Sequence, residues 1–156
     1  MGLDPGIRIA DFESRYAAAF KTLNLEWLER FFSVEPLDEQ ILEDGAAIIE
    51  HGGAILFALA DDAPVGCCAL KHQGGGVYEL TKMAVTESHQ GLGLGRLLGE
   101  ATIQRFVELG GKTLFLESHD SLVPALKLYE SLGFRHTERL NPSPYARSNV
   151  YMVWQP

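Results

Sequence analysis

The stretch 77–98, VYELTKMAVTESHQGLGLGRLL, decides the fold. Its first part, 77–85, has the apolar pattern of a strand, and a glycine-rich turn then opens an amphipathic helix. Gly91, Gly93 and Gly95 carry no side chain that would keep a phosphate away from the backbone. The unpaired N–H groups of the following helix supply donors and the positive end of its dipole. The stretch therefore predicts a site for a ligand that carries phosphates.

Two common phosphate-binding motifs are excluded. The chain has no GxxxxGK[ST] sequence, so a nucleoside triphosphatase is not indicated. A dinucleotide-binding GxGxxG pattern that started at Gly91 would need glycine or alanine where Arg96 stands. The same pattern started at Gly93 would need one where Leu98 stands, so neither register is satisfied.

Two motifs are present instead: Gln90-x-x-Gly93-x-Gly95 followed by Arg96, and the stretch 125–134, ALKLYESLGF. Together they resemble the GNAT superfamily of acyl-CoA-dependent N-acetyltransferases, in which a pyrophosphate loop precedes a long helix, a strand and a helix with an LYExxGF-like end. The resemblance covers roughly the second half of the chain closely, and the first half by its order of elements. It implies an α/β (α+β) fold: one GNAT-like domain with a central, twisted, mixed but mostly antiparallel sheet flanked by helices.

Composition is consistent with one domain. The 156 residues are 46% hydrophobic, with a mean hydropathy near zero, which is enough apolar material for a sizeable core. We expect a single acetyltransferase domain over 1–156, with a mainly helical acceptor-side section over 1–53 and an acetyl-CoA-binding core over 54–156.

Charge and length bear on partners and location. A net charge of −8 and a pI near 5.0 argue against nucleic acid and anionic membranes, and weakly favour cationic partners such as amines. Many cytoplasmic proteins are acidic merely for solubility, however. No apolar run approaches the roughly 20 residues of a membrane span, and the start MGLDPGIRIADF lacks secretory-signal features. We therefore expect a cytoplasmic protein.

Cysteine and histidine usage indicates no metal. Cys67 and Cys68 are neighbours whose side chains should point to opposite faces of a strand, so neither a disulfide framework nor a metal quartet is available. We expect both to be reduced core residues. The histidines lie at scattered positions without ligand spacing.

Periodicity predicts the order of elements. Strands are expected over 7–12, 55–60, 65–71, 77–85 and 113–117, from 134 onward, and over 149–154. Helices are expected from a cap at Ser14 to Phe31, either as one helix or as two with a break near Asn24, and over 37–50, 93–109 and 123–132.

The resemblance assigns the cofactor residues. It implies that the CoA pyrophosphate binds the loop formed by Gln90, Gly91, Leu92, Gly93, Leu94, Gly95 and Arg96, and that the pantetheine arm runs along Met83, Ala84 and Val85. Many relatives have an asparagine just after the next strand, whereas this chain has the run 118–121, SHDS. Ser118 and Ser121 are the candidate substitutes as hydrogen-bonding residues.

Acetyl transfer needs a base or a water path that removes a proton, because an alkyl amine with a pKa of about 10.4 is almost entirely protonated at neutral pH. The resemblance places Glu79 in that role, six residues before Val85. The alternatives are a strand glutamate that faces solvent and one that pairs with Lys82 or Lys71. The sequence alone does not choose among them.

Departure of CoA as a thiolate needs an acid. The resemblance assigns this role to Tyr129 of the LYExxGF-like stretch, since a phenol with a pKa near 10 stays protonated at pH 7. The alternative is an aromatic residue on the core face of a helix, because Tyr129 also lies at helical spacing from Ala125 and Leu126. His119 is either a second proton carrier or a surface residue.

The acceptor side is built from elements that vary within the family. The candidate substrate-binding residues are Asn24, Trp27, Phe31 and Phe32 from the helical section, and Tyr145 and Arg147 from the loop before the last strand. The alternative for each of them is a residue that only packs in the core or lies on the surface, and this alternative is the favoured one. Arg147 would be important if the substrate has a carboxylate.

Three functions remain open. The first is acetyl transfer by direct attack of a primary amine, either a small amine or amino acid or a protein lysine or amino terminus. The second is a non-catalytic acyl-CoA-binding or sensing module, and the third is a nucleotide-binding structural protein. Retention of both Glu79 and Tyr129 favours the enzyme. Many relatives are dimers, but the sequence does not decide between a monomer and a homodimer.

Overall fold

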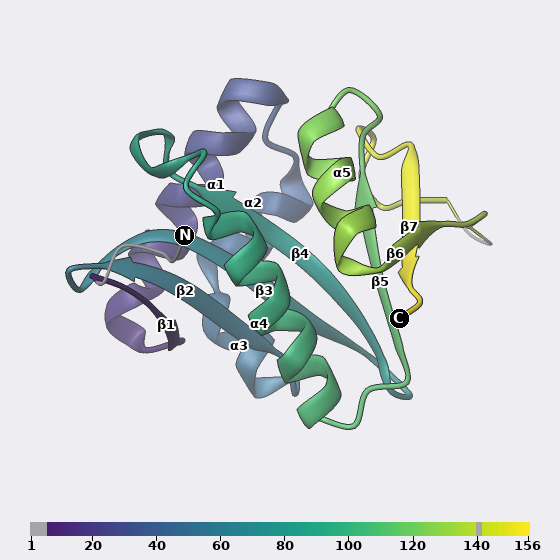
Figure 1. Cartoon of the computed structure of the whole chain (residues 1–156), viewed down its shortest axis with the longest axis horizontal. Helices are drawn as coiled ribbons and strands as arrows, with labels where there is room; N and C mark the ends of the chain where they lie inside the picture. The colour runs from purple at the N-terminus through teal and green to yellow at the C-terminus, as the bar shows by residue number, and fades with distance from the viewer. Residues whose placement is uncertain (1–5, 140–141) are drawn as a thin grey trace.

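The computed structural model describes residues 6–139 and 142–156, which form a seven-stranded mixed sheet between two layers of helices (Figure 1). This is the predicted fold class. The elements are β1 (Ile7–Asp11), η1 (Ser14–Tyr16), α1 (Ala17–Phe31), α2 (Pro36–Glu43), α3 (Gly45–Glu50), β2 (Ala54–Ala60), β3 (Ala63–Gly74), β4 (Val77–Val85), η2 (Glu87–His89), α4 (Leu94–Glu108), β5 (Thr113–Ser118), α5 (Val123–Leu132), β6 (Phe134–His136) and β7 (Val150–Trp154).

The strand order is β1-β2-β3-β4-β5-β7-β6, and among the strands of the described residues only β4 and β5 pair in parallel. That pair is short: it begins at Val77 with Thr113 and ends at Glu79 with Phe115. Beyond Glu79 the two strands diverge. In Figure 1, β4 and β5 lie together at the lower right and separate toward the top of the picture. The sheet therefore opens into a wedge between the later residues of β4 and β5.

A bulge in β4 shapes one side of this wedge. The register with β3 shifts between Cys67, which pairs with Ala84, and Ala69, which pairs with Thr81, so β4 holds one extra residue. Lys82, within the extra segment, has a φ of +55°, a left-handed conformation that is uncommon for a residue with a side chain. The bulge buries the Lys82 side chain, which is only 4% exposed.

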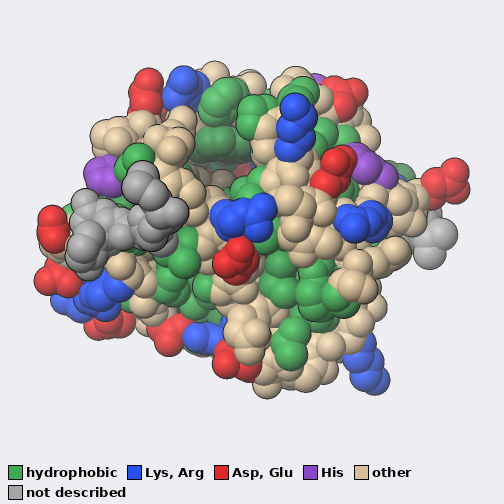
Figure 2. Space-filling view, in the orientation of Figure 1, with side chains coloured by type: hydrophobic (Ala, Val, Ile, Leu, Met, Phe, Trp, Pro, Cys, Tyr) green, Lys and Arg blue, Asp and Glu red, His purple; other side chains and the backbone are tan. Residues whose placement is uncertain are grey.

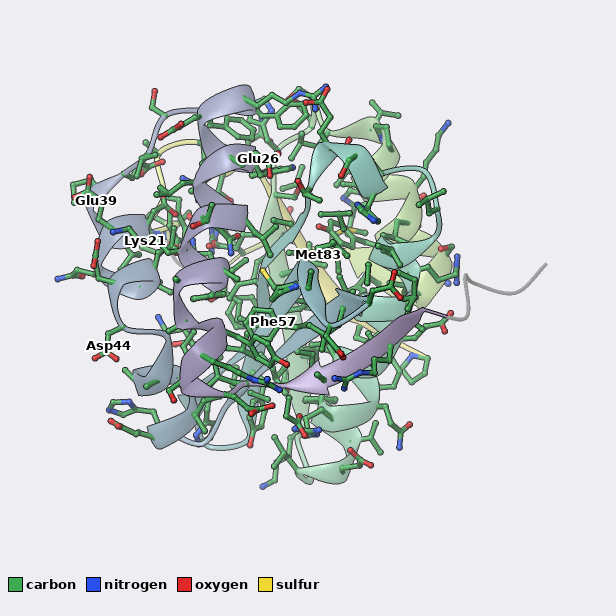
Figure 3. All side chains as sticks on the ribbon, turned by 90° about the vertical axis from the view of Figure 1, so that its left-hand side faces the viewer. Lys21, Glu26, Glu39, Asp44, Phe57 and Met83 are labelled. Carbon is green, nitrogen blue, oxygen red and sulfur yellow. The ribbon has the colours of Figure 1, made fainter. Side chains whose placement is uncertain are left out.

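Two apolar cores lie on the two faces of the sheet. Helices α1, α2 and α3 cover one face, and α4 and α5 cover the other, as Figure 3 shows. Cys67 and Phe57 belong to the first core, whereas Cys68 belongs to the second. The two thiols are free, fully buried and on opposite faces, so their prediction as reduced core residues is confirmed.

The helical section differs from the prediction in two places, the helix over 37–50 and the cap at Ser14, and it selects one of the two alternatives left open near Asn24. The helix expected over 37–50 is two helices, because Asp44 leaves the helical conformation and its side chain accepts a hydrogen bond from the Ala47 N–H (3.2 Å). Helix α1 continues through Asn24 without the break that was left open. Ser14 is no cap; it lies within η1 instead.

Other boundaries agree with the prediction to within two residues, except the end of β3. That strand continues to Gly74, which pairs with Val77, because the turn between β3 and β4 is tighter than expected. None of the helices in the described part of the chain is long and apolar enough to cross a membrane.

Candidate active site

A groove lies where β4 ends, between the glycine-rich loop, α5 and the last turns of α1. Figure 2 shows this side of the molecule hollowed, with hydrophobic side chains on the walls. Gly91 and Gly93 both have positive φ values, +78° and +84°, which glycine adopts without strain. These two conformations turn the chain sharply into α4, so the first turn of α4 lines the groove.

The loop side of the groove has unpaired backbone N–H groups and open space. The first intrahelical bond of α4 runs from the Leu97 N–H to the Gly93 carbonyl, so the preceding N–H groups of the first turn have no carbonyl to bond within the helix. A Cβ at Gly95 would lie 3.2 Å from Leu128, so glycine permits the close approach of α5. A Cβ at Gly91 would meet no atom within 4 Å, which leaves the loop open to a ligand.

Most of the residues predicted to bind the cofactor line this groove: Met83, Ala84, Val85, Gln90, Gly91, Gly93, Leu94, Gly95 and Ser121. Leu92 does not line it and is 56% exposed. Arg96 does not line it either, because its guanidinium pairs with Glu100 and donates to Ser131. Ser118 lies instead in a second cavity, described next. The binding roles of all these residues remain predictions.

The second cavity, here called the acceptor cleft, occupies the wedge between β4 and β5. Its volume is about 90 Å³, against about 540 Å³ for the groove. Four residues line both hollows: Trp27, Met83, Leu122 and Tyr129. A ligand along the groove and a ligand in the cleft would therefore meet at these four side chains.

Glu79 lies in the acceptor cleft and is 7% exposed. Its Oε1 accepts a hydrogen bond from Gln73 (3.2 Å), and it has no ion pair with Lys71 or Lys82 among the described residues. Burial raises the pKa of Glu79 to about 7, with a further contribution from the charge of Glu117; Lys71, Lys82 and Gln73 oppose this rise. Glu79 therefore neither faces solvent nor pairs with a lysine of the described residues, which were the two alternatives that the sequence left open.

Glu117 is a second carboxylate in the acceptor cleft, and the sequence analysis missed it. Its side chain is 6% exposed and pairs with Arg139. Glu79 belongs to the last β4–β5 pair, with Phe115, and Glu117 lies two residues beyond Phe115 on β5, where the two backbones begin to separate. The alternation of β5, which buries Leu114 and Leu116, pointed to a buried strand but gave no signal that Glu117 would face a cavity.

Tyr129 stands between the groove and the acceptor cleft. It is half-buried, and its ring packs edge-on against Phe134, with centroids 6.2 Å apart. Burial, followed by the charge of Cys68, raises the pKa of Tyr129 above its usual value, so the phenol stays protonated. The residue thus combines a core contact with a position at the junction of the two hollows.

The acceptor candidates divide between the two hollows. Asn24, Trp27, Phe32, Tyr145 and Arg147 line the acceptor cleft, whereas Phe31 lines only the groove. Asn24 is 2% exposed, and its Nδ2 donates to the Phe20 carbonyl (2.9 Å) and to the Cys67 sulfur (3.3 Å). Asn24 therefore also ties α1 to β3.

An aromatic group closes the top of the cleft. The Trp27 ring lies 5.4 Å from that of Phe31 and 5.7 Å from that of Phe32. Phe32 in turn meets the His119 ring edge-on at 5.5 Å. These contacts join the end of α1 to the loop after β5, two segments far apart in the chain, so the aromatic wall between the hollows is rigidly packed.

A buried charge cluster forms the other side of the acceptor cleft. Asp38, fully buried, accepts from Lys82 Nζ at 2.7 Å and from two nitrogens of Arg147, both at 2.8 Å. Arg147 also pairs with Glu35 (3.1 Å), and Lys82 donates to the Tyr145 hydroxyl (3.1 Å). The cluster joins α2, the β4 bulge and the loop before β7.

Asp38 is ionised in this cluster. Burial alone would raise its pKa, but the hydrogen bonds from Arg147, Lys82 and the Glu35 backbone outweigh burial and lower the pKa to about 2. The sequence analysis singled out Arg147 but missed Asp38 and Lys82. No signal in the sequence pointed to Asp38, because an aspartate in a short helix is usually exposed, whereas the structure buries this one.

Within the described residues, 6–139 and 142–156, no group of three or more His, Cys, Asp or Glu side chains is arranged to hold a metal ion.

Comparison with known proteins identifies the class. The family model described as "Acetyltransferase (GNAT) family" matches residues 19–134. An uncharacterized N-acetyltransferase of Schizosaccharomyces pombe is 33% identical over 140 residues, which cover 85% of this chain and 84% of that protein. The chain belongs to the GNAT acetyltransferase family. N-acetylaspartate synthetase of Homo sapiens is 34% identical over 86 residues, which cover 54% of this chain and 28% of that protein.

Solved structures share the fold. A GNAT-family acetyltransferase of Staphylococcus aureus has a TM-score of 0.86 at 20% identity, covering 95% of this chain and 98% of that one. An N-acetyltransferase of Thermoplasma acidophilum in complex with coenzyme A has a TM-score of 0.74 at 15% identity (96% and 99% covered). An acetyltransferase of Elizabethkingia anophelis with acetyl-CoA bound has a TM-score of 0.66 at 18% identity (98% and 100% covered).

Proposed function

We propose that this protein is an N-acetyltransferase that moves an acetyl group from acetyl-CoA to the primary amine of a small acceptor. The observation that carries the proposal is the junction of the two hollows: a groove with free helix N–H groups meets a cleft that holds a buried carboxylate, Glu79, at the phenol of Tyr129. The acetyl donor and the amine acceptor would therefore meet between a general acid, Tyr129, and a general base, Glu79.

Glu79 acts as the general base. With a pKa of about 7, this carboxylate is half-ionised at neutral pH and takes a proton from an ammonium group better than an ordinary glutamate does. Burial, the main cause of the raised pKa, also keeps bulk water from the amine. Proton transfer runs either directly or through one water molecule.

Tyr129 acts as the general acid. When bound, acetyl-CoA supplies the acetyl thioester. The amine nitrogen forms a bond to the carbonyl carbon, the carbon–sulfur bond breaks, and the Tyr129 hydroxyl gives its proton to the leaving sulfur and regains one from solvent. The raised pKa of Tyr129 keeps this proton in place until the thiolate develops.

The attack is direct. The two cysteines of the chain are fully buried, and burial raises the pKa of Cys68 to about 12, so neither thiol offers a nucleophilic thiolate. Because no cysteine is available to carry the acetyl group, the acceptor amine itself is the nucleophile.

A small acceptor is favoured over a protein lysine or amino terminus. The acceptor cleft is enclosed between β4, β5 and α1, and its volume is about 90 Å³. The curated relative named N-acetylaspartate synthetase, by its name, makes the acetyl derivative of an amino acid. Both observations support a small amine or amino acid as the acceptor.

The test is a measurement of acetyl-CoA binding by calorimetry, followed by CoA release in the presence of a panel of primary amines. Micromolar binding together with amine-dependent CoA release supports the proposal. Binding without turnover of any amine would instead indicate a non-catalytic acyl-CoA module, and competition by ATP or NAD would indicate a nucleotide-binding protein.

A further inference from the structure

We propose that the acceptor carries a carboxylate beside its amine, as a free amino acid does, and that Lys82, Arg147 and Ser148 bind this carboxylate while Glu79 and Glu117 face the amine. The inference rests on the proposed acetyl transfer and assigns its substrate class. It depends on the distribution of donors and acceptors around the acceptor cleft.

One side of the cleft has a surplus of hydrogen-bond donors. The ammonium of Lys82 has three N–H groups, but only two acceptors contact it among the described residues, Asp38 and the Tyr145 hydroxyl. Arg147 has five N–H groups, and Asp38 and Glu35 occupy its two terminal nitrogens. Each cation therefore retains donor capacity at the cleft.

Ser148 adds a third donor. Its hydroxyl oxygen is buried and has no hydrogen-bond partner in the described structure, although the residue lines the cleft. A buried hydroxyl without a partner costs about 1–3 kcal/mol, so such groups usually have a ligand or water to bond. Together with Lys82 and Arg147, Ser148 gives this side of the cleft a set of donors that suits an anion.

The other groups in the cleft complement an ammonium. Glu79 and Glu117 are carboxylates on the two diverging strands, and both are largely buried; Glu117 also pairs with Arg139, so Glu79 is the carboxylate without an ion pair among the described residues. Carboxylates accept hydrogen bonds and donate none when ionised. An acceptor with its amine toward Glu79 and Glu117 and its carboxylate toward Arg147 would satisfy both sets of groups.

Asp38 is a positioning residue in this scheme. It touches no ligand site directly, because its two oxygens are occupied by Lys82 and Arg147. By holding both cations with one fully buried carboxylate, Asp38 fixes the spacing of the two donors and offsets part of their charge. The anion site is thus preorganised by α2, an element that contributes no side chain to the lining of the cleft.

The experiment compares the twenty proteinogenic L-amino acids with their α-carboxamides as acceptors, with CoA release as the readout. The carboxamides keep the amine and remove the negative charge. We expect kcat/KM for the best amino acid to exceed that of its amide by about 100-fold. In Arg147→Gln this ratio should fall at least tenfold, and Arg147→Lys should restore part of it, since the charge returns without the planar fork.

Controls separate specificity from folding. Arg8→Gln removes an exposed arginine of the edge strand β1 that pairs with Asp62 in the turn between β2 and β3, and it should leave the acid-to-amide ratio unchanged. Ser148→Ala removes only one buried oxygen, so it should fold even where an Arg147 variant does not, and it should lower the ratio several-fold.

Each outcome decides the matter. Equal acetylation of amides and free acids, or a ratio unmoved by Ser148→Ala and Arg147→Gln, would overturn the carboxylate site while the acetyl transfer stands. Binding of acetyl-CoA without acetylation of any acceptor, simple amines included, would overturn the proposed function, and the inference with it.

Discussion

The groove and the acceptor cleft are built in opposite ways. The loop side of the groove comes from one continuous segment, 83–95, and works through backbone N–H groups and positive-φ glycines. The cleft takes side chains from α1, β4, β5 and the loop before β7, and a buried carboxylate on α2 holds two of them. A locally built site tolerates change elsewhere in the chain, whereas a site assembled from distant elements depends on the whole fold.

Glu79→Gln should have the largest effect, because it removes the base of the cleft and leaves the groove intact. We expect kcat to fall by about 10²–10⁴-fold, with little change in acetyl-CoA affinity. The wild-type rate should rise with pH through about 7 as Glu79 ionises, and the variant should lose this rise. Measurement of kcat against pH checks both points.

Glu39→Gln is the matched control, since Glu39 is an exposed glutamate of α2 outside both hollows. A pH profile of Glu79→Gln that still rises through neutral pH would show that another group is the base.

Gly93→Glu tests the groove alone. It places a negatively charged side chain at the residue that caps α4 in a left-handed conformation (φ +84°), where the phosphates are proposed to bind. Acetyl-CoA affinity, measured by calorimetry, should fall by about 100-fold or more from like-charge repulsion and steric filling. Gly110→Glu, at the other end of α4 with φ +73° and open space around it, introduces the same strain and charge without this loss. If both variants bind acetyl-CoA equally well, the loop is not the phosphate site.

Tyr129→Phe acts at the junction of the two hollows. Removing only the hydroxyl should lower kcat by about 100-fold or less and leave the affinity for acetyl-CoA nearly unchanged, because the ring contact with Phe134 is kept. Tyr151→Phe, whose ring packs on Phe115 away from both hollows, serves as the control. Unchanged turnover in Tyr129→Phe would reduce this residue to a packing role.

The smallest effect concerns stability. The pKa of Glu79 is about 7 in the folded protein and about 4.5 in the unfolded chain, so the folded state binds this proton more tightly. The free energy of unfolding of the wild type therefore loses a contribution as pH rises from about 4.5 to 7. Glu79→Gln lacks this loss, so it should gain about 3 kcal/mol relative to the wild type between pH 4.5 and pH 8.

Denaturant unfolding at these two pH values checks the prediction. A stability difference that does not depend on pH would mean that Glu79 has an ordinary pKa and is poorly suited to act as the base.

Much of the fold could be predicted because its signals are local. The strand 77–85 and the helix 123–132 were predicted to the residue, since alternation, helical spacing and flanking glycines mark both. The prediction of one helix over 37–50 was wrong. The Asp44 carboxylate accepts a hydrogen bond from the Ala47 N–H, so the first helix ends at this point and a second one begins. Such an end depends on one side-chain hydrogen bond that periodicity does not reveal.

By itself, the sequence determined the class of protein, the position of the phosphate loop and the candidacy of Glu79 and Tyr129, because these depend on contiguous motifs. Only the tertiary structure decided that Glu79 is buried in a cleft, that Glu117 lies near it, and that Asp38 holds Lys82 and Arg147 together. These facts arise from the divergence of β4 and β5 and from contacts between residues up to 109 positions apart. Desolvation and long-range ion pairing are properties of the packed chain, and no local pattern encodes them.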